Sequence, residues 1–161
     1  MLDTVTDAHY AVPVEAAFGS SIGAHLRHCL DHFTSFLAGT AECRINYDHR
    51  EREVTLEQDR IVALDRVRKM RESISRLNTT ILSRPVNVTS KVLAHGASAQ
   101  EAPSSFAREL MYVVAHTLHH FALIRVMSSI LNAELPHEFG VAPSTLDHRK
   151  VPGASAGRVE A

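Results

Sequence analysis

The chain has 161 residues and a formal net charge of −1, with 17 Lys and Arg residues against 18 Asp and Glu residues. This length suits one domain with a single core, and the balanced charge gives no electrostatic footprint for nucleic acid or an anionic membrane surface. We see no signal-peptide pattern, no apolar run approaching the ~20 residues of a membrane span, and no CxxC motif or disulfide framework. We therefore expect a cytoplasmic protein that partners neither nucleic acid nor a membrane.

The first long helix is predicted to begin at Ser20 or Ser21 and to run to about Leu37, with Gly39 ending it. A serine hydroxyl can accept a backbone N–H at a helix N-terminus, and a glycine commonly follows the last turn. The segment before this helix, up to Phe18, is weakly patterned and is interrupted by a proline.

Three histidines form a stripe along one side of this helix. His25, His28 and His32 lie at positions i, i+3 and i+7, beside the apolar stripe that faces the core. From that edge an imidazole can reach a neighbouring helix, although for any one of the three a solvated surface histidine is the simpler interpretation. Cys29 belongs to the apolar stripe, and we expect a small core residue there rather than a nucleophile.

The loop that follows, INYDHRERE, is the best candidate for substrate contacts. Arg50 and Arg52 have the planar, two-pronged head that binds carboxylates, and Tyr47 can donate a hydrogen bond. The alternative interpretation, of equal weight, is a turn and helix start held by its own ion pairs.

The second helix is predicted to begin at a capping box formed by Thr55 and Gln58, and the segment Ser83-Arg84-Pro85 is predicted to stop it. Its apolar residues recur at three- to four-residue spacing, and charges of alternating sign occupy the other face. Residues 85–93 are β-prone but too short to build a sheet alone, so a hairpin or an extended crossover is the most that they support.

The third long helix is predicted to start at Ser104 or Ser105, to end near Leu131, and to carry the motif HTLHH. Its first and last histidines, His116 and His120, are one helical turn apart, so both imidazoles project from the same face and can bind one metal ion. The surrounding residues are apolar around nearly the whole helix, which predicts burial. Core histidines satisfied by other hydrogen bonds are the alternative interpretation.

The motif differs from that of HExxH zinc proteases, because Thr117 stands where the catalytic glutamate would be. The nearest carboxylate, Glu109, is two turns from His116, which weakens a metal-dependent hydrolysis. His119 is turned well away from His120, so we leave it out of the site. One histidine of the first helix together with His116 and His120 would supply three neutral nitrogen ligands and leave positions open for water or substrate.

Three long helices with short connections predict an all-α bundle. We expect one domain over residues 1–146 and a disordered tail over residues 147–161. Two partner helices cannot cover a third helix that is apolar around most of its girth. The N-terminal segment, a second subunit or both must cover it, and we predict a homodimer.

The segment SIGAHLRHCLDHF, with its His28-x-x-Asp31 core, followed by His116-x-x-x-His120, resembles the DinB/YfiT-like superfamily of four-helix bundles. INYDHRERE and FGVAPSTL resemble a bacterial branch of that superfamily, and the similarity spans about residues 20–146. The resemblance implies an up-down helical bundle with a shortened N-terminal helix, and metal ligands at His28, His116 and His120.

Helix-face geometry alone slightly prefers His25 or His32 over His28, because both lie nearer the apolar stripe. We keep His25 and His32 as alternative ligands or as groups that support the ligands. Asp31 can orient a ligand imidazole by accepting its second N–H.

The resemblance also implies a chemistry, because characterised members of the superfamily include metal-dependent S-transferases that use low-molecular-weight thiols and an isomerase with a thiol cofactor. A divalent ion, with zinc or nickel expected, would bind the thiol, lower its pKa and present a thiolate to a small electrophilic substrate. The alternative is a non-catalytic, metal-binding and stress-related dimeric bundle.

Overall fold

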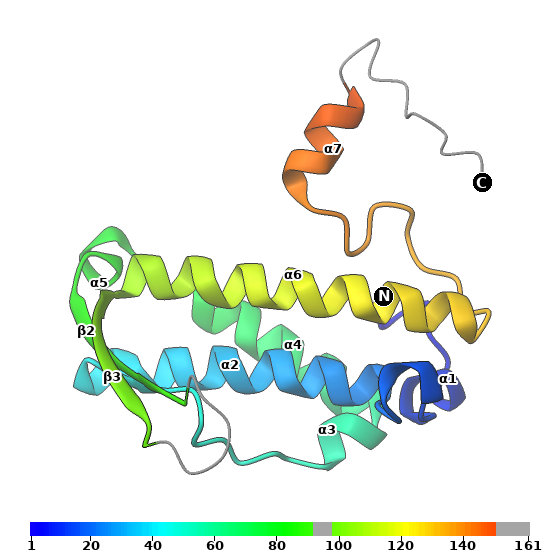
Figure 1. Ribbon diagram of the computed structural model, residues 1–161, viewed down its shortest axis with the longest axis horizontal. Helices are drawn as coiled ribbons and strands as arrows, with labels where there is room; N and C mark the ends of the chain where they lie inside the picture. Colours follow the sequence, from blue (N-terminus) through cyan, green and yellow to red (C-terminus); the bar gives the residue numbers. More distant parts are fainter. Residues whose placement is uncertain (92–97, 151–161) are drawn as a thin grey trace.

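The computed structural model describes residues 1–91 and 98–150. Its long helices α2 and α6 lie side by side, with α4 packed against α2 (Figure 1). The strands gather at the end of the bundle where α6 begins. In chain order the elements are α1 (Asp7–Ala11), η1 (Glu15–Ala17), α2 (Ile22–Glu42), β1 (Arg44–Asn46), α3 (Thr55–Gln58), α4 (Arg60–Ser75), α5 (Thr79–Leu82), β2 (Pro85–Ser90), β3 (Gln100–Ser105), α6 (Phe106–Ile130) and α7 (Pro143–Lys150).

Helix α2 begins where the sequence predicts, since the Ser21 side chain accepts the backbone N–H of Ala24. The predicted end at Gly39 is wrong, because the helix continues to Glu42. Gly39 is buried inside it, and an added Cβ would lie 2.5 Å from Ile45 Cγ1 and 2.6 Å from the Arg44 carbonyl oxygen. The glycine therefore lets β1 pass close to α2.

The second predicted helix is divided into two. Asp59 adopts an extended backbone after α3, and its carboxylate accepts the N–H groups of Ile61 and Val62 to cap α4. The predicted capping box of Thr55 and Gln58 is wrong, because the Thr55 hydroxyl donates to Glu53 instead of capping the helix. Helix α4 also ends at Ser75, before the predicted stop at Ser83-Arg84-Pro85, and the separate short helix α5 lies between them.

A small three-stranded sheet, in the order β1-β2-β3, corrects the expectation of a purely all-α fold. Strands β2 and β3 pair antiparallel, with Val86 opposite Ser104. The sequence predicts a hairpin or an extended segment within residues 85–93, whereas the second strand, β3, lies beyond that range at Gln100–Ser105. Strand β1 adds in parallel, with Ile45 opposite Val88. Residues 92–93, the last two of the predicted β-prone segment, lie outside the described residues. The protein is thus mostly helical, with a minor sheet.

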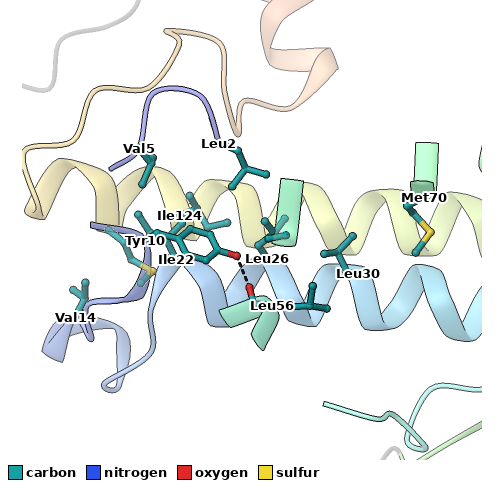
Figure 2. Close-up of a cluster of buried hydrophobic side chains, with 12 residues drawn as sticks. Leu2, Val5, Tyr10, Val14, Ile22, Leu26, Leu30, Leu56, Met70 and Ile124 are labelled. Carbon is teal, nitrogen blue, oxygen red and sulfur yellow. Dashed lines mark hydrogen bonds between the residues drawn. The ribbon is translucent and has the colours of Figure 1, made fainter. Parts of the chain in front are cut away.

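Two clusters of buried apolar side chains form the core. One lies toward the N-terminal end of α2, where the Tyr10 hydroxyl donates to the Leu56 carbonyl over 2.5 Å (Figure 2). The other lies beside the sheet and contains Phe36, Phe106 and Val113. The short α1 packs against α2 and α3 at the position where the sequence predicts no long helix.

Helix α6 begins as predicted, because the Ser105 side chain caps it by accepting the Arg108 N–H. By length and composition it is the one helix in residues 1–91 and 98–150 that could cross a membrane. The expectation that no apolar run approaches the length of a membrane span is therefore wrong for α6 by length and composition. Helix α6 packs on α2 through one face, but only 17% of its apolar window is buried. The burial that the sequence predicts around nearly the whole helix is therefore wrong, because the other face is exposed at residues such as Met111 and Val126.

The C-terminal part contains one more helix. Helix α7 covers Pro143–Lys150, so the first residues of the predicted tail, from Asp147, are helical. Residues 151–161 lie outside the part of the chain that the structure describes, and the boundary between domain and tail stays a prediction.

Candidate metal centre

The histidines of the first and last long helices meet between α2 and α6. The two helices run antiparallel, so His25 faces His120 at one level and His28 faces His116 at the next. The Nε2 atoms of His28 and His116 are 2.8 Å apart, and so are the Nδ1 atoms of His25 and His120. The fold therefore brings the two sequence clusters together, as the helix periodicity predicts.

Three of these residues form the tightest group. His28, His32 and His116 each place a nitrogen within 4.8 Å of the others, an arrangement that can hold a metal ion. Two of the predicted ligands, His28 and His116, belong to this group. The third predicted ligand, His120, pairs with His25 instead, although its ring centroid is 4.5 Å from that of His28 and 4.6 Å from that of His116.

The neighbouring histidine of the HTLHH motif takes no part in this group. His119 is exposed, with its ring centroid 5.5 Å from that of His120.

Burial keeps the imidazoles neutral. It lowers the pKa of His28 and of His32 to about 3 and that of His120 to about 4, with smaller contributions from the neighbouring histidines. The pKa values of His25 and His116 are lowered for the same reason. At neutral pH each imidazole therefore has a free lone pair, which is the form that binds metal ions.

Arg50 contacts two of the histidines. Its Nη1 donates to His28 Nδ1 over 2.9 Å and to His32 Nε2 over 3.3 Å. A guanidinium only donates, so both nitrogens are acceptors without a proton. The His28 proton then lies on Nε2 and is donated to His116. The His32 proton lies on Nδ1, which is buried and has no hydrogen-bond partner among residues 1–91 and 98–150.

The residues present fit a divalent ion once Arg50 is displaced. A ligating His28 Nε2 must be unprotonated, which moves the proton to Nδ1 and breaks the bond from Arg50. Two nitrogens on one tetrahedral zinc ion are roughly 3.3 Å apart, given bonds of about 2.0–2.1 Å. The His28 and His116 nitrogens, now 2.8 Å apart, need to separate by only about half an ångström.

Two other predicted residues, Asp31 and Arg52, form no hydrogen bond with an imidazole in the part of the chain that the structure describes. Asp31 is buried and accepts from Arg27 Nη1 over 3.3 Å, and within residues 1–91 and 98–150 no hydrogen bond joins it to a histidine. Burial raises the pKa of its carboxyl group. Arg52 is exposed, with a left-handed backbone at φ 51°.

Tyr47 is buried beside the centre, and its hydroxyl is already used. Its ring stacks on His32 with centroids 5.2 Å apart, and its hydroxyl donates to Glu109 Oε2 over 3.0 Å. The other Glu109 oxygen accepts from the Ser104 hydroxyl over 2.6 Å. Burial, followed by the nearby Glu109 charge, raises the Tyr47 pKa, so the phenol stays protonated.

Sequence reasoning missed Tyr112, and it considered Glu109 only as a carboxylate two turns from His116. Glu109 is buried, and Tyr112 stacks on His116 with centroids 5.8 Å apart. Together with Tyr47 and Arg108 they line a cleft of about 430 Å³ between the hairpin and the start of α6. The sequence signal for this cleft is the three- and four-residue spacing that places Glu109, Tyr112 and His116 on one helix face.

Cys29 plays no part in the chemistry of the centre. It is buried, and burial raises the pKa of its thiol to about 12, so the thiol stays protonated. The structure thus places it in the core, as the apolar stripe predicts.

The fold and the two histidine motifs agree with a family match, because the model of the DinB family matches residues 1–131. The chain belongs to the DinB family. A curated protein similar to this DinB family chain is FK506-binding protein 5 of Rhizopus delemar, 36% identical over 106 residues. The alignment covers 66% of this chain and 28% of that relative, so the chain spans less than a third of it. No solved structure matches.

Proposed function

We propose that this DinB family protein is a divalent-metal-dependent S-transferase that joins a low-molecular-weight thiol to a small electrophile. The observation that carries the proposal is the group of neutral, partly buried histidines from α2 and α6, with His28 and His116 nitrogens already 2.8 Å apart. Membership of the DinB family supports a metal at this place. Zinc or nickel is the expected ion.

The proposed ligands are His28, His116 and one further histidine. The family resemblance points to His120, whereas the grouping of nitrogens within 4.8 Å favours His32. We propose His32, because His120 already faces His25. Removing each one separately distinguishes the two assignments.

In the proposed reaction the thiol sulfur forms a bond to the electrophilic carbon. The thiol proton is released to solvent, and the leaving group departs with the electron pair of the broken bond. A bound divalent ion would act as a Lewis acid that lowers the pKa of the thiol.

The protein's own residues bind and orient the reactants. Arg50, displaced from His28, remains beside the centre, where its guanidinium can pair with a carboxylate of the thiol in bidentate fashion, and Arg52 belongs to the same loop. The Tyr47 hydroxyl is bonded to Glu109, so Tyr47 contributes its ring, which stacks on His32 and orients that imidazole. The cleft of about 430 Å³ beside Tyr112 offers space for the electrophile.

The first test is the metal content of untagged protein, with His116→Ala as the variant and His119→Ala as its matched control on the exposed side of the same helix. We expect at least one zinc or nickel ion per chain in the parent and in the control, and its loss in His116→Ala. The metal-loaded parent should then transfer thiols, and Arg50→Ala should raise KM for the thiol about tenfold, as the loss of one charged pair predicts. A parent without metal after loading with zinc or nickel would refute the proposal.

The alternative is a non-catalytic, stress-related bundle in which the metal stabilises the fold. The His-to-His contacts between α2 and α6 favour it as much as they favour an enzyme, because an ion there would join the two longest helices. If metal binding contributes to the folding free energy, His116→Ala should lower the unfolding temperature sharply. An enzyme should keep its fold in that variant and lose thiol transfer.

We also propose that the protein is a homodimer that pairs through α6. Large apolar side chains are exposed along this helix, among them Met111 at 73%, Val126 at 59% and Val114 at 52%. Phe18, fully exposed at 104%, lines a cavity with Val126 on the same side. A face this long would be buried by its copy in a two-fold pair.

Light scattering on a size-exclusion column tests the dimer. We expect twice the chain mass of 17.7 kDa for the parent. Val126→Asp should give the monomer, whereas Ile61→Asp, at a similarly exposed aliphatic residue of α4, should leave the dimer intact. A monomeric parent would contradict the proposal. A cytoplasmic location likewise remains part of the proposal.

A further inference from the structure

An apolar cavity between α2, α4 and α6 has no part in the proposed reaction. Its volume is about 250 Å³, and each of the three helices contributes to its walls. Helix α4 packs on α2, whereas the backbones of α4 and α6 stay largely apart. The side chains between α4 and α6 therefore leave part of the space there unfilled.

The walls of this cavity are almost entirely apolar. Leu26 and Leu30 line it from α2 and Met70 lines it from α4, and Figure 2 shows these three side chains in one region of the core. Thr117 presents its methyl group, because its hydroxyl oxygen is covered. A cavity of about 150 Å³ with aliphatic and aromatic walls excludes water and binds an apolar molecule. We expect the same of this larger one.

The cavity is elongated along the helices. Its lining runs from Leu26 to Phe33 on α2 and from Val67 to Ile74 on α4. At about 1.5 Å per residue, each of these stretches covers roughly 10 Å along its helix axis. An extended alkyl chain fits such a space better than a compact ring system does.

Arg71 brings a positive charge to the mouth of this cavity. It is exposed, and it is the one charged residue among the described residues that line the walls. Two neighbouring cations of α4 are neutralised, because Arg66 pairs with Glu53 and Lys69 with Asp65. Within residues 1–91 and 98–150, no carboxylate pairs with Arg71. Its guanidinium is thus free to bind the carboxylate of a ligand.

We propose that this cavity binds a medium-chain aliphatic carboxylate, with the alkyl chain inside and the head group on Arg71. Burial of the chain in an apolar space supplies the affinity, and the guanidinium selects an anion over a neutral molecule of the same length. The inference goes beyond the proposed function. It needs no metal ion, so either proposal can fail while the other stands.

Nuclear magnetic resonance of the full chain, labelled with carbon-13 at the methionine methyl groups, tests the location. Met70 lines this cavity, Met127 lines the cavity beside Phe18, and Met111 is exposed on α6. Titration with octanoate, below the concentration at which it forms micelles, should shift the Met70 resonance to saturation with a Kd of about 1 mM or lower. The Met111 and Met127 resonances should stay in place. No saturable shift of Met70, or a larger shift of either other methionine, would overturn the inference.

Filling the cavity should prevent binding. We expect Val67→Phe, in the cavity wall, to weaken octanoate binding about tenfold or more, because the added ring atoms occupy the space of the chain. Val62→Phe, at an exposed valine of the same helix outside the lining, is the matched control and should leave the Kd unchanged. Circular dichroism should show that both variants are folded. Equal Kd values in the two variants would overturn the assignment to this cavity.

The head group is tested by removing one charge. Arg71→Gln should weaken octanoate binding about threefold, as expected for an ion pair exposed to solvent, and should leave the binding of neutral 1-octanol unchanged. Arg68→Gln removes the same charge from an exposed position of α4 outside the lining and should have no effect on either molecule. An equal loss of octanoate binding in both variants would reflect net charge alone and would overturn the role of Arg71.

Discussion

A metal ion bound at His28 would compete with the Arg50 guanidinium. The bond from Arg50 Nη1 to His28 Nδ1, 2.9 Å long, fixes the tautomer in which Nε2 carries the proton and cannot ligate. Metal binding therefore has to break a charged hydrogen bond, a cost of about 1.5–3 kcal/mol. The residue proposed to bind substrate thus also sets the metal affinity.

Replacing Arg50 by alanine should therefore tighten zinc binding. We expect the zinc Kd to fall about tenfold, because about 1.4 kcal/mol of competing interaction is removed. Competition with a chelating dye measures the change, and Arg52→Ala, an exposed arginine two residues away, is the matched control and should leave the Kd unchanged. Weaker zinc binding in Arg50→Ala would show that the guanidinium supports the site instead of competing with the metal.

The Tyr47 hydroxyl satisfies a buried carboxylate. Tyr47→Phe should lower the free energy of unfolding by about 1–3 kcal/mol, because Glu109 then loses one of its partners inside the protein. Urea unfolding measures the loss, and Tyr112→Phe, whose ring is 37% exposed, is the control. Equal stability of Tyr47→Phe and the parent would mean that solvent reaches Glu109 readily.

The sequence predicts which histidines gather between α2 and α6 better than it predicts the partners of each. The one-turn spacing of His116 and His120 and the stripe that contains His28 follow from helix periodicity alone. Which nitrogens meet across the helices depends on the axial offset of α2 and α6, and no local pattern contains that offset. The bond from Arg50 to His28 and the burial of Glu109 are likewise products of tertiary packing.

At the scale of elements, helix starts were predictable and some breaks were not. Ser21 and Ser105 cap α2 and α6 as predicted, because a cap is a local contact. Gly39 does not end α2, since its lack of a side chain serves the close approach of β1. Strand β1 was missed because three residues of parallel pairing leave almost no sequence signal.

The variant Gly39→Ala distinguishes the effect of helix propensity on stability from the effect of the close contact between α2 and β1. Propensity alone predicts that alanine stabilises a helix interior by about 1 kcal/mol. We expect the opposite, a loss of about 1–3 kcal/mol, because the new Cβ would lie 2.6 Å from the Arg44 carbonyl oxygen. Thermal unfolding measures the change. Ala38→Gly, at an exposed position in the same turn, should lose about 1 kcal/mol by propensity alone, and a stabilised Gly39→Ala would refute the packing argument.

At the scale of the whole molecule, the bundle and its family follow from two helix motifs, while the sheet and the α3–α4 break depend on packing. The contact between α2 and α6 forms part of the core and also contains the paired histidines His25–His120 and His28–His116. Stability and metal binding should therefore respond to the same change, the protonation of these imidazoles.

The metal-free protein should lose stability as the pH falls from 7.5 to 5.5. The folded pKa values of His28 and His32 are about 3 and that of His120 about 4, whereas the ordinary histidine value is 6.5. Between these limits the unfolded chain binds more protons than the folded chain, so the free energy of unfolding decreases as the pH falls. The raised pKa of Asp31 acts in the opposite sense, but it is one group against several imidazoles.

We expect a loss of about 3 kcal/mol between these two pH values, or about 10 °C in Tm for a chain of this size. Calorimetry in the presence of a chelator measures it. The double variant His28→Gln, His32→Gln should show a flatter pH profile, and His137→Gln, an exposed histidine after α6, should keep the parent profile. A Tm that does not change between pH 7.5 and 5.5 would mean that His28, His32 and His120 take up protons while the protein stays folded. The imidazoles would then not be held neutral by burial, and the lone pairs on which metal binding depends would be lost to protons in mild acid while the fold persists.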